Sequence, residues 1–252
     1  MTARFTGKVV LITGGGSGIG RAAALAFAGE GATVVVAGRN AEPLAETVKL
    51  IEAEGGRADA VTADVSSSPD VARLVATTVE RHGGLHIAFN NAGVLETGPL
   101  ADMDEAAWDR LISVNLTGVF LSMKHQIAHM RDNGGGVIIN TASNLGAHMR
   151  LPYLGAYAAS KAAVSALSRA AARECIGQGI RVNAISPGPV DTAMSLRPGE
   201  TEDARAERMK DAVPIGRVGT LAEAASAVIW LASPEAGFTV GHDLVIDGGA
   251  SA

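Results

Sequence analysis

A tyrosine and a lysine four residues apart, Tyr157 and Lys161, are the side chains of this sequence best suited to moving a proton. They lie in an alanine-rich stretch with helical spacing, which would place both on one face of a helix. A phenol has a pKa near 10, so deprotonating it at neutral pH costs about 4 kcal/mol. An ammonium group about 4 Å away contributes roughly 4 kcal/mol at an effective dielectric constant of 20. The pair could therefore form an acid–base group, or it could be an ordinary pair on a helix surface.

Two polar residues upstream could assist such a pair. Ser143 lies just past an apolar run that ends at Asn140, and its hydroxyl could donate to a carbonyl oxygen of a substrate. Its alternative role is capping or turn formation. Asn115 lies within a stretch of helical periodicity, although asparagine is a poor helix former. The alternative for Asn115 is a polar residue hydrogen-bonded in the core.

A glycine-rich turn follows the first apolar run of the chain. Residues 9–12 suit a buried strand, the turn has the spacing Gly14-x3-Gly18-x-Gly20, and a helical pattern begins at Arg21. Glycines let a phosphate approach the main chain, and the first N–H groups of a helix point at it. A turn of purely structural use is the alternative. The position of the turn after the first strand of a βαβ unit favours a nucleotide site.

Strand and helix patterns alternate from one end of the chain to the other. Strands are predicted over residues 9–12, 33–37, 57–62, 85–89, 137–140, 181–185 and 244–246. Helices are predicted from residue 21, over about 41–51, from 69 to about 82, and over about 104–131, 155–177, 202–212 and 221–232. Helical crossovers without tight hairpins predict an α/β fold, an open parallel sheet with helices on both faces, in one domain spanning residues 1–252. Ligands of such sheets bind beyond the carboxyl ends of the strands.

The segment 187–219 is the one place where the apolar periodicity fades. It is too long for an ordinary connection and contains only the short helix predicted over residues 202–212. The segment is therefore interpreted as a lid over the site.

The composition excludes several classes of protein. Of the 252 residues, 47% are hydrophobic and 19% are charged, so a large core is expected and wholesale disorder is not. A net charge of −5 argues against a nucleic-acid surface, and no run reaches the roughly 18 apolar residues of a membrane span. Cys175 is the only cysteine and the N-terminus lacks an apolar signal sequence. We expect a soluble cytoplasmic protein without a membrane, nucleic-acid or metal partner.

The whole chain resembles the compact, single-domain subgroup of the short-chain dehydrogenase/reductase family. Together and in this order, the motifs that carry the resemblance are highly specific. They are Thr13-Gly-Gly-Gly-Ser-Gly-Ile-Gly20, Asp64-Val65, Asn90-Asn-Ala-Gly93, Asn115, Ser143, Tyr157-Ala-Ala-Ser-Lys161, Pro187-Gly188 with Thr192, and Asp247-Gly-Gly249. The resemblance implies a Rossmann-type, doubly wound seven-stranded sheet that binds a nicotinamide dinucleotide.

The resemblance also implies a role for each residue. Tyr157 is the general acid in reduction and the base in oxidation, and Lys161 lowers its pKa and holds the nicotinamide ribose. Ser143 steadies the substrate oxygen, and Asn115 links Lys161 to a water chain that resupplies protons. The cofactor-binding residues, beyond Tyr157 and Lys161, are then Gly14, Ser17, Gly18, Ile19, Gly20, Arg39, Asp64, Val65, Asn90, Ala92, Gly93, Pro187, Gly188, Val190 and Thr192.

The residue after the second strand bears on which nicotinamide binds. An acidic side chain there would accept a hydrogen bond from a ribose hydroxyl and repel a 2′-phosphate. This chain has Gly38-Arg39-Asn40 instead, and the fork of Arg39 suits a phosphate. Arg39 could alternatively be a solvated residue at a helix start, and Ser17 stands where many NADP-using relatives carry a second basic residue. The prediction is NADP(H) over NAD(H), with NAD(H) use left open.

The substrate wall is expected from residues 94–97, residues 144–154 and the lid. It is mostly apolar, with polar tips at His148, Arg150 and Tyr153; His148 either acts on a substrate or is a rim histidine without chemistry. We expect a ketone or a secondary alcohol of moderate size. The apolar positions are Leu145, Met149, Leu151, Leu154 and Met194.

Small residues line the helix that carries Tyr157, and they allow close packing on the sheet or on a partner subunit. Relatives commonly form tetramers, so a homotetramer or a homodimer is expected.

The closest rival function is an NAD-dependent dehydrogenase that oxidises a sugar or a hydroxysteroid. A sugar-nucleotide epimerase is disfavoured, since such relatives are longer and have a separate C-terminal substrate domain. A non-catalytic binding protein is disfavoured by the intact Ser143, Tyr157 and Lys161.

Overall fold

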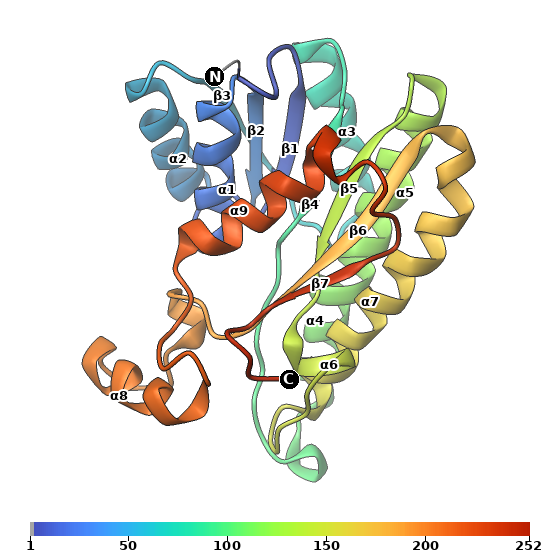
Figure 1. The fold of residues 1–252 in the computed structure, drawn as a ribbon. Coiled ribbons are helices and arrows are strands. Elements are labelled where there is room, and N and C mark those ends of the chain that lie inside the picture. The colour runs from blue at the N-terminus through green and yellow to red at the C-terminus, as the bar shows by residue number, and fades with distance from the viewer. Residues whose placement is uncertain (1–2) are drawn as a thin grey trace.

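The structure, a computed structural model, describes residues 3–252. Seven parallel strands form one sheet, as predicted, and the structure gives their order as β3-β2-β1-β4-β5-β6-β7 (Figure 1). The strands are β1 (Val9–Thr13), β2 (Thr33–Gly38), β3 (Arg57–Thr62), β4 (Ile87–Asn90), β5 (Gly136–Thr141), β6 (Ile180–Pro187) and β7 (Asp243–Ile246). The strand order reverses between β1 and β4, where the carboxyl ends of two neighbouring strands open a crevice.

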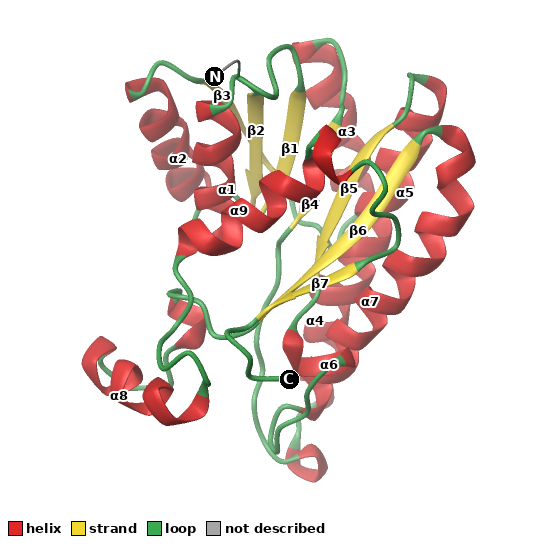
Figure 2. Cartoon of the chain, viewed as in Figure 1, coloured by secondary structure: helices red, strands yellow, loops and turns green. Residues whose placement is uncertain are grey.

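Helices cover both faces of the sheet, as Figure 2 shows. The α-helices are α1 (Gly18–Gly29), α2 (Ala41–Ala53), α3 (Ser68–His82), α4 (Glu105–Ile112), α5 (Gly118–Asp132), α6 (Asn144–Ala147), α7 (Gly155–Cys175), α8 (Glu202–Ala212) and α9 (Leu221–Ala232). Short 3₁₀ turns occupy Leu100–Asp102, Ile176–Gln178, Ala193–Ser195 and Pro234–Ala236. None of the helices described within residues 3–252 combines the length and apolar character needed to cross a membrane.

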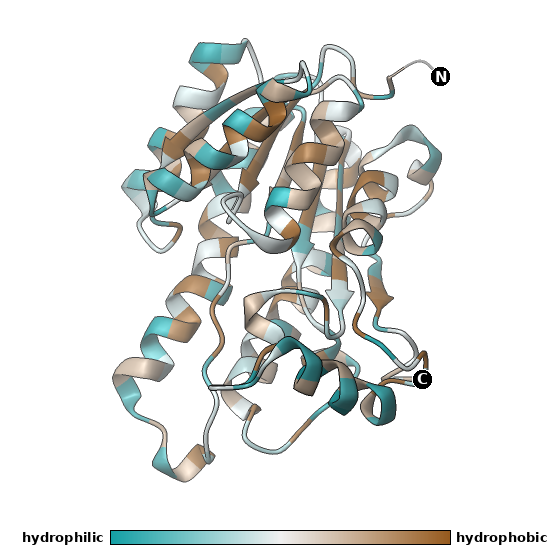
Figure 3. Cartoon of the chain, turned by 90° about the vertical axis from the view of Figure 1, so that its left-hand side faces the viewer, coloured by the Kyte–Doolittle hydropathy of each residue, from teal (hydrophilic) through white to brown (hydrophobic). Residues whose placement is uncertain are grey.

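The sheet separates two apolar cores. Val10 and Ile12 of β1 pack with α1, α2 and α9, whereas Leu11 between them packs on the other face with α3, α5 and α7. This alternation follows from the two-residue period of a strand, and both faces are buried because helical crossovers cover each side. In Figure 3 the strands are largely hydrophobic in colour.

Three polar residues mark the carboxyl edge of the sheet at one level. The register pairs Thr13 with Asn90 and Asn90 with Asn140. The Asn90 amide donates to Asn140 over 2.9 Å, and it exchanges hydrogen bonds with Gln126 of α5 at 3.0 and 2.8 Å. These buried amides satisfy one another. They link the ends of the neighbouring strands β4 and β5 to α5 next to the crevice.

Two local features differ from the sequence predictions. The helix predicted over residues 104–131 is continuous, but Ser113–Thr117 forms a π-helical turn between α4 and α5. The short helix α6 was not predicted, and its residues Leu145 and Gly146 have non-helical dihedral angles. Helical periodicity does not reveal a single π turn or a four-residue turn, since neither carries a repeating apolar pattern.

Candidate active site

The glycine turn leads into α1, whose first N–H groups point toward the crevice. Ser17 is the N-cap of α1, and its side chain makes no capping hydrogen bond. The turn is held from behind by α1 and α2. The Thr47 hydroxyl donates to the Gly15 carbonyl over 2.9 Å, and the Arg21 guanidinium donates to the Gly16 carbonyl over 2.5 Å. These contacts leave the N-terminus of α1 as a preformed binding site for an anion.

Thr13 and Asn91 connect the glycine turn to the end of β4. The Thr13 hydroxyl oxygen accepts hydrogen bonds from the main-chain N–H groups of Asn91 (3.1 Å) and Ala92 (3.2 Å). The Asn91 amide in turn donates to the carbonyls of Thr13 and Gly14, each over 3.3 Å. A Cβ atom on Gly20 would lie 2.2 Å from the Gly14 oxygen, so only glycine fits there. The positioning roles of Thr13 and Asn91 were not predicted, although both belong to recognised motifs.

The side chains of Ser143, Tyr157 and Lys161 lie together and are buried, with 5, 8 and 3% of each residue exposed. Ser143 follows β5, and Tyr157 and Lys161 are on the first turns of α7. Lys161 donates from Nζ to the Thr141 carbonyl over 2.7 Å, and its Nζ lies 5.9 Å from the centre of the Tyr157 ring. The four-residue spacing of Tyr157 and Lys161 thus brings both side chains together with Ser143 at the carboxyl end of β5.

Burial dominates the electrostatics of this group. It raises the pKa of the Tyr157 phenol, and the side-chain hydrogen bond with Ser143 opposes that rise. Burial also lowers the pKa of Lys161 to about 8, so Lys161 remains mostly an ammonium at neutral pH. Burial is the larger of the two causes acting on Tyr157, and the lowering of the phenol pKa by Lys161 stays a prediction.

Asn115 lies in the π turn between α4 and α5 and is fully buried. Its side-chain oxygen accepts from the Val94 N–H over 2.8 Å, and its amide donates to the Val94 carbonyl over 2.9 Å. The amide also lies 3.2 Å from the Ser160 hydroxyl. A Cβ atom on Gly93 would lie 3.3 Å from the Asn115 oxygen and 3.5 Å from Lys161 Nζ. Asn115 and Lys161 therefore face the same small space above Gly93.

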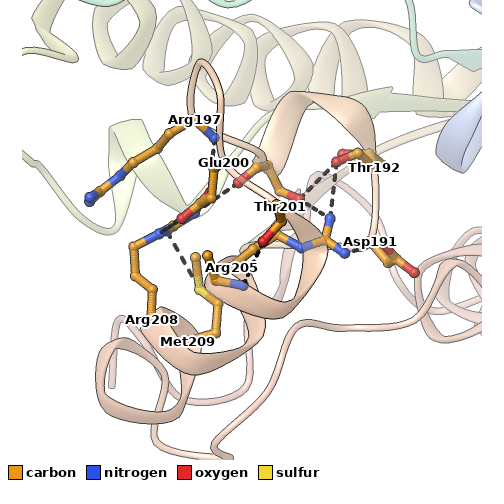
Figure 4. A network of polar contacts seen from close by, with 10 residues as sticks. Asp191, Thr192, Arg197, Glu200, Thr201, Arg205, Arg208 and Met209 are labelled. Atoms are coloured by element: carbon orange, nitrogen blue, oxygen red, sulfur yellow. Dashed lines mark hydrogen bonds and ion pairs between the residues drawn. The ribbon is translucent and has the colours of Figure 1, made fainter.

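The segment after β6 closes over the glycine turn. A Cβ atom on Gly18 would lie 3.2 Å from the Thr192 side chain, and one on Gly188 would overlap Asp247 at 2.6 Å. Val190 is buried. Arg205 of α8 donates to the Thr192 carbonyl (3.3 Å) and to Asp191 (2.6 Å), as Figure 4 shows. The helix predicted within the lid thus holds the residues expected to cover the nicotinamide.

Several predicted residues lie at the edge of this arrangement. Arg39 and Ser17 are exposed, and within residues 3–252 neither side chain makes a hydrogen bond. The Asp64 carboxylate accepts from the main chain and hydroxyl of Ser66, at 2.9 and 2.6 Å. Val65 packs against Gly118 at the start of α5. These positions surround the crevice without contacting Tyr157.

The predicted substrate wall is divided. Val94, Leu95 and Leu145 pack with Met103 around Tyr157 and form an apolar lining. By contrast, Leu151, Tyr153 and Met194 are 44, 65 and 45% exposed. The wall therefore consists of a partly buried inner part next to Tyr157 and an exposed outer rim.

The residues present fit a dinucleotide. The uncapped N-terminus of α1 suits a pyrophosphate, and the polar space above Gly93 presents Lys161 and Asn115 together. The buried Thr141 hydroxyl, on the strand that leads to Ser143, has no hydrogen-bond partner among residues 3–252. Among residues 3–252, no three His, Cys, Asp or Glu side chains lie together in a way that could hold a metal ion.

Comparison with known proteins gives matches along the whole chain. A family model described as "Enoyl-(Acyl carrier protein) reductase" matches residues 14–251. Cyclohexanol dehydrogenase of Acinetobacter sp. (strain SE19) is 39% identical over 98% of this chain and 96% of its own length. 3beta-hydroxysteroid dehydrogenase 1 of Eggerthella lenta is 41% identical over 96% of this chain and 93% of its own. The structure of levodione reductase superimposes with a TM-score of 0.93 and 37% identity, covering 98% of this chain and 99% of the other.

Proposed function

The chain belongs to the short-chain dehydrogenase/reductase family, and we propose that it transfers a hydride reversibly between a nicotinamide cofactor and a ketone or a secondary alcohol. The observation that carries this proposal is the buried group of Ser143, Tyr157 and Lys161 at the carboxyl end of β5. The group lies at the same edge of the sheet as the glycine turn. Family membership makes the protein an oxidoreductase, and the arrangement of the site supports the roles proposed below.

In the proposed reaction the nicotinamide, when bound, supplies or accepts the hydride. Tyr157 donates a proton to the carbonyl oxygen in reduction and accepts it in oxidation. The raised pKa of the phenol keeps its proton in place until charge develops on that oxygen. The Ser143 hydroxyl, which counteracts the rise in the pKa of the Tyr157 phenol, orients the same oxygen. The lining of Val94, Leu95 and Leu145 excludes water from the reacting carbon.

Lys161 and Asn115 support the proton transfer in this proposal. The Lys161 ammonium, held by the Thr141 carbonyl, stabilises a phenolate as it forms and is placed to bind the nicotinamide ribose. The π turn sets Asn115 beside the same space, where its amide oxygen can order a water next to Lys161. These roles account for a lysine and an asparagine buried among apolar neighbours.

For the cofactor we propose NADP(H), with NAD(H) as the alternative. The exposed Arg39 stands at the end of β2, next to the glycine turn, and has no partner within residues 3–252. Its guanidinium is free to bind a 2′-phosphate. Comparing kcat/KM for NADPH and NADH tests this choice, and a strong preference for NADH would reverse it.

We propose that the substrate is an uncharged cyclic ketone or alcohol of moderate size. The inner wall is apolar, and two of the relatives above are named for cyclohexanol and a 3beta-hydroxysteroid, which carry a secondary hydroxyl on a ring. Residues 187–219 form the lid over this substrate in the proposal. The competing possibility differs in cofactor and direction: an NAD-dependent dehydrogenase that oxidises a sugar or a hydroxysteroid.

A panel of cyclic and linear ketones, secondary alcohols and sugars tests the proposed function. Each compound is mixed with the purified protein and either nicotinamide, and absorbance of the reduced cofactor is followed. Cyclohexanone or a related ring ketone is expected to give turnover with NADPH. Turnover restricted to sugars or hydroxysteroids with NAD⁺ would support the competing possibility, and no turnover with any pair would contradict the proposal.

We further propose that the protein assembles in the cytoplasm into a homotetramer, with a homodimer as the smaller alternative. Large apolar side chains are exposed on two helical surfaces, Trp108 and Phe120 on α4 and α5, and Trp230 and Phe238 on and after α9. A second copy of the chain would cover them. Light scattering at micromolar concentration is expected to show the oligomer, and a monomer would contradict it.

A further inference from the structure

A buried carboxylate behind the site, Asp243 at the start of β7, joins three elements of the active site. Its side chain is 1% exposed. The hydroxyls of Ser165 and Ser186 each donate to it over 2.6 Å, and His148 donates from Nε2 over 2.9 Å. Buried carboxylates need several such donors to remain stable. Within residues 3–252, His148 is the basic side chain that pairs with Asp243.

The three donors come from the parts of the chain that surround the reaction. Ser165 is one turn beyond Lys161 on α7, and Ser186 directly precedes Pro187 at the end of β6. His148 comes from the loop after α6, and its side chain is 22% exposed. Asp243 therefore connects the catalytic helix and the start of the lid to the loop that begins at Ser143.

That loop has no helical repeat to keep its shape. Leu145 and Gly146 are non-helical, with φ of 147° at Gly146. The turn is closed by hydrogen bonds from Gly146 N to Met149 O (2.8 Å) and from Met149 N to Asn144 O (2.7 Å). Tertiary contacts set the position of this turn. Gly146 packs against the backbone of α7, Asn144 donates to Asp247 over 3.2 Å, and His148 donates to Asp243.

We propose that His148 is a positioning residue, whose hydrogen bond to Asp243 fixes the turn 143–149 and thereby holds the Ser143 hydroxyl against Tyr157. This inference rests on the proposed function and adds a residue to it. Ser143 is the N-cap of α6 and its side-chain oxygen accepts from Leu145 N over 3.1 Å, so a shift of the turn moves Ser143. Displacing a reacting group by a fraction of an ångström is sufficient to slow a reaction.

Substitutions at His148 that differ only in their reach test this proposal. His148→Gln places an amide N–H where Nε2 lies, His148→Asn carries the same amide one bond too short, and His148→Leu has no donor. The control is His242→Gln, an exposed histidine that precedes Asp243 in the chain. With cyclohexanone and NADPH, kcat is expected to fall about tenfold in His148→Asn and His148→Leu and less than about threefold in His148→Gln. KM, cofactor affinity and the control are expected to change less than about twofold.

Comparing kcat of His148→Gln with kcat of His148→Asn tests the positioning role of His148 even if His148→Leu does not fold. Equal kcat in His148→Asn and wild type would overturn the proposal, whatever happens to the melting temperature. An equal loss in His148→Gln and His148→Asn would also overturn it, because the imidazole would then act on the substrate directly. Wild-type protein without turnover on any compound of the panel would instead contradict the proposed function, so the two failures are distinguishable.

Discussion

Two polar regions flank the proposed substrate, and they are held in different ways. On one side, Ser143, Tyr157 and Lys161 are buried, and the ammonium group bonds to a main-chain carbonyl. On the other, the proposed lid, residues 187–219, is held by arginine–carboxylate pairs, Arg205 with Asp191 and Arg208 with Glu200, both at 2.6 Å. The hydrogen bond from Arg208 lowers the pKa of Glu200 to about 2. Figure 4 shows this network.

The difference indicates what each region does. The buried group of Ser143, Tyr157 and Lys161 keeps its geometry. Its charges and dipoles act more strongly on the reacting atoms, because the surrounding dielectric constant is low. The lid helix α8 is largely hydrophilic, and its ion pairs are partly exposed to solvent and to salt. Substitutions in the buried catalytic group should therefore affect turnover, and substitutions in the proposed lid should affect substrate binding.

The largest effect is expected when the hydroxyl of Tyr157, the proposed proton donor, is removed. Tyr157→Phe keeps the ring and its packing but loses the hydroxyl. Turnover of cyclohexanone should fall by about two orders of magnitude or more. Cofactor binding, measured by fluorescence titration, should persist. Near-wild-type turnover in this variant would remove Tyr157 from the mechanism.

The buried ammonium predicts a pH effect on stability. The pKa of Lys161 is about 8 in the folded protein and 10.5 ordinarily, so between these values the unfolded chain binds more protons. Stability from this group therefore rises with pH across that window. The difference in urea unfolding free energy between wild type and Lys161→Met should shift in favour of wild type by about 2 kcal/mol from about pH 7.5 to about pH 9.5. A flat difference would show that Lys161 is not desolvated.

The exposed Arg39 after β2 should show a smaller, cofactor-specific effect. Arg39→Ala removes the proposed partner of the 2′-phosphate, so kcat/KM with NADPH should fall about tenfold. The value with NADH should change less than about twofold. Arg57→Ala, an exposed arginine at the start of β3, is the matched control. An equal loss with both cofactors would contradict the role of Arg39.

The lid should give the smallest effect, and it should appear in KM. Arg205→Ala removes the hydrogen bonds to Thr192 and Asp191, so KM for cyclohexanone should rise about fivefold with kcat nearly unchanged. Lys210→Ala breaks an exposed ion pair on the same helix and should change neither constant. A fall in kcat in Arg205→Ala comparable to that of Tyr157→Phe would contradict the separate roles of the buried catalytic group and the lid.

The sequence predicted the sheet because each strand is a short apolar run between helical repeats, as in Val9–Thr13. It also predicted which side chains converge: Tyr157 and Lys161 share a helix face, and Ser143 follows the strand next to that helix. Parallel topology brings such positions to one edge, so their proximity follows from order along the chain.

The irregular parts were not predictable from local patterns. The π turn at Asn115 and the short helix α6 depend on tertiary contacts, such as Gly146 against α7. The raised pKa of Tyr157 reflects how closely its neighbours exclude water, which no spacing in the sequence encodes. Asp243 stands 78 residues from Ser165 in the chain, and only the fold joins them.

Transfer of deuterium from the cofactor to the product tests whether this protein moves a hydride with the help of Tyr157. The purified protein is incubated with cyclohexanone and NADPH carrying two deuterium atoms at C4 of the nicotinamide, and the product is examined by mass spectrometry. The account predicts cyclohexanol one mass unit heavier than unlabelled product, formed by wild type and at a rate at least about a hundredfold lower by Tyr157→Phe. Product that carries no deuterium, or labelled product formed equally fast by both proteins, would contradict it.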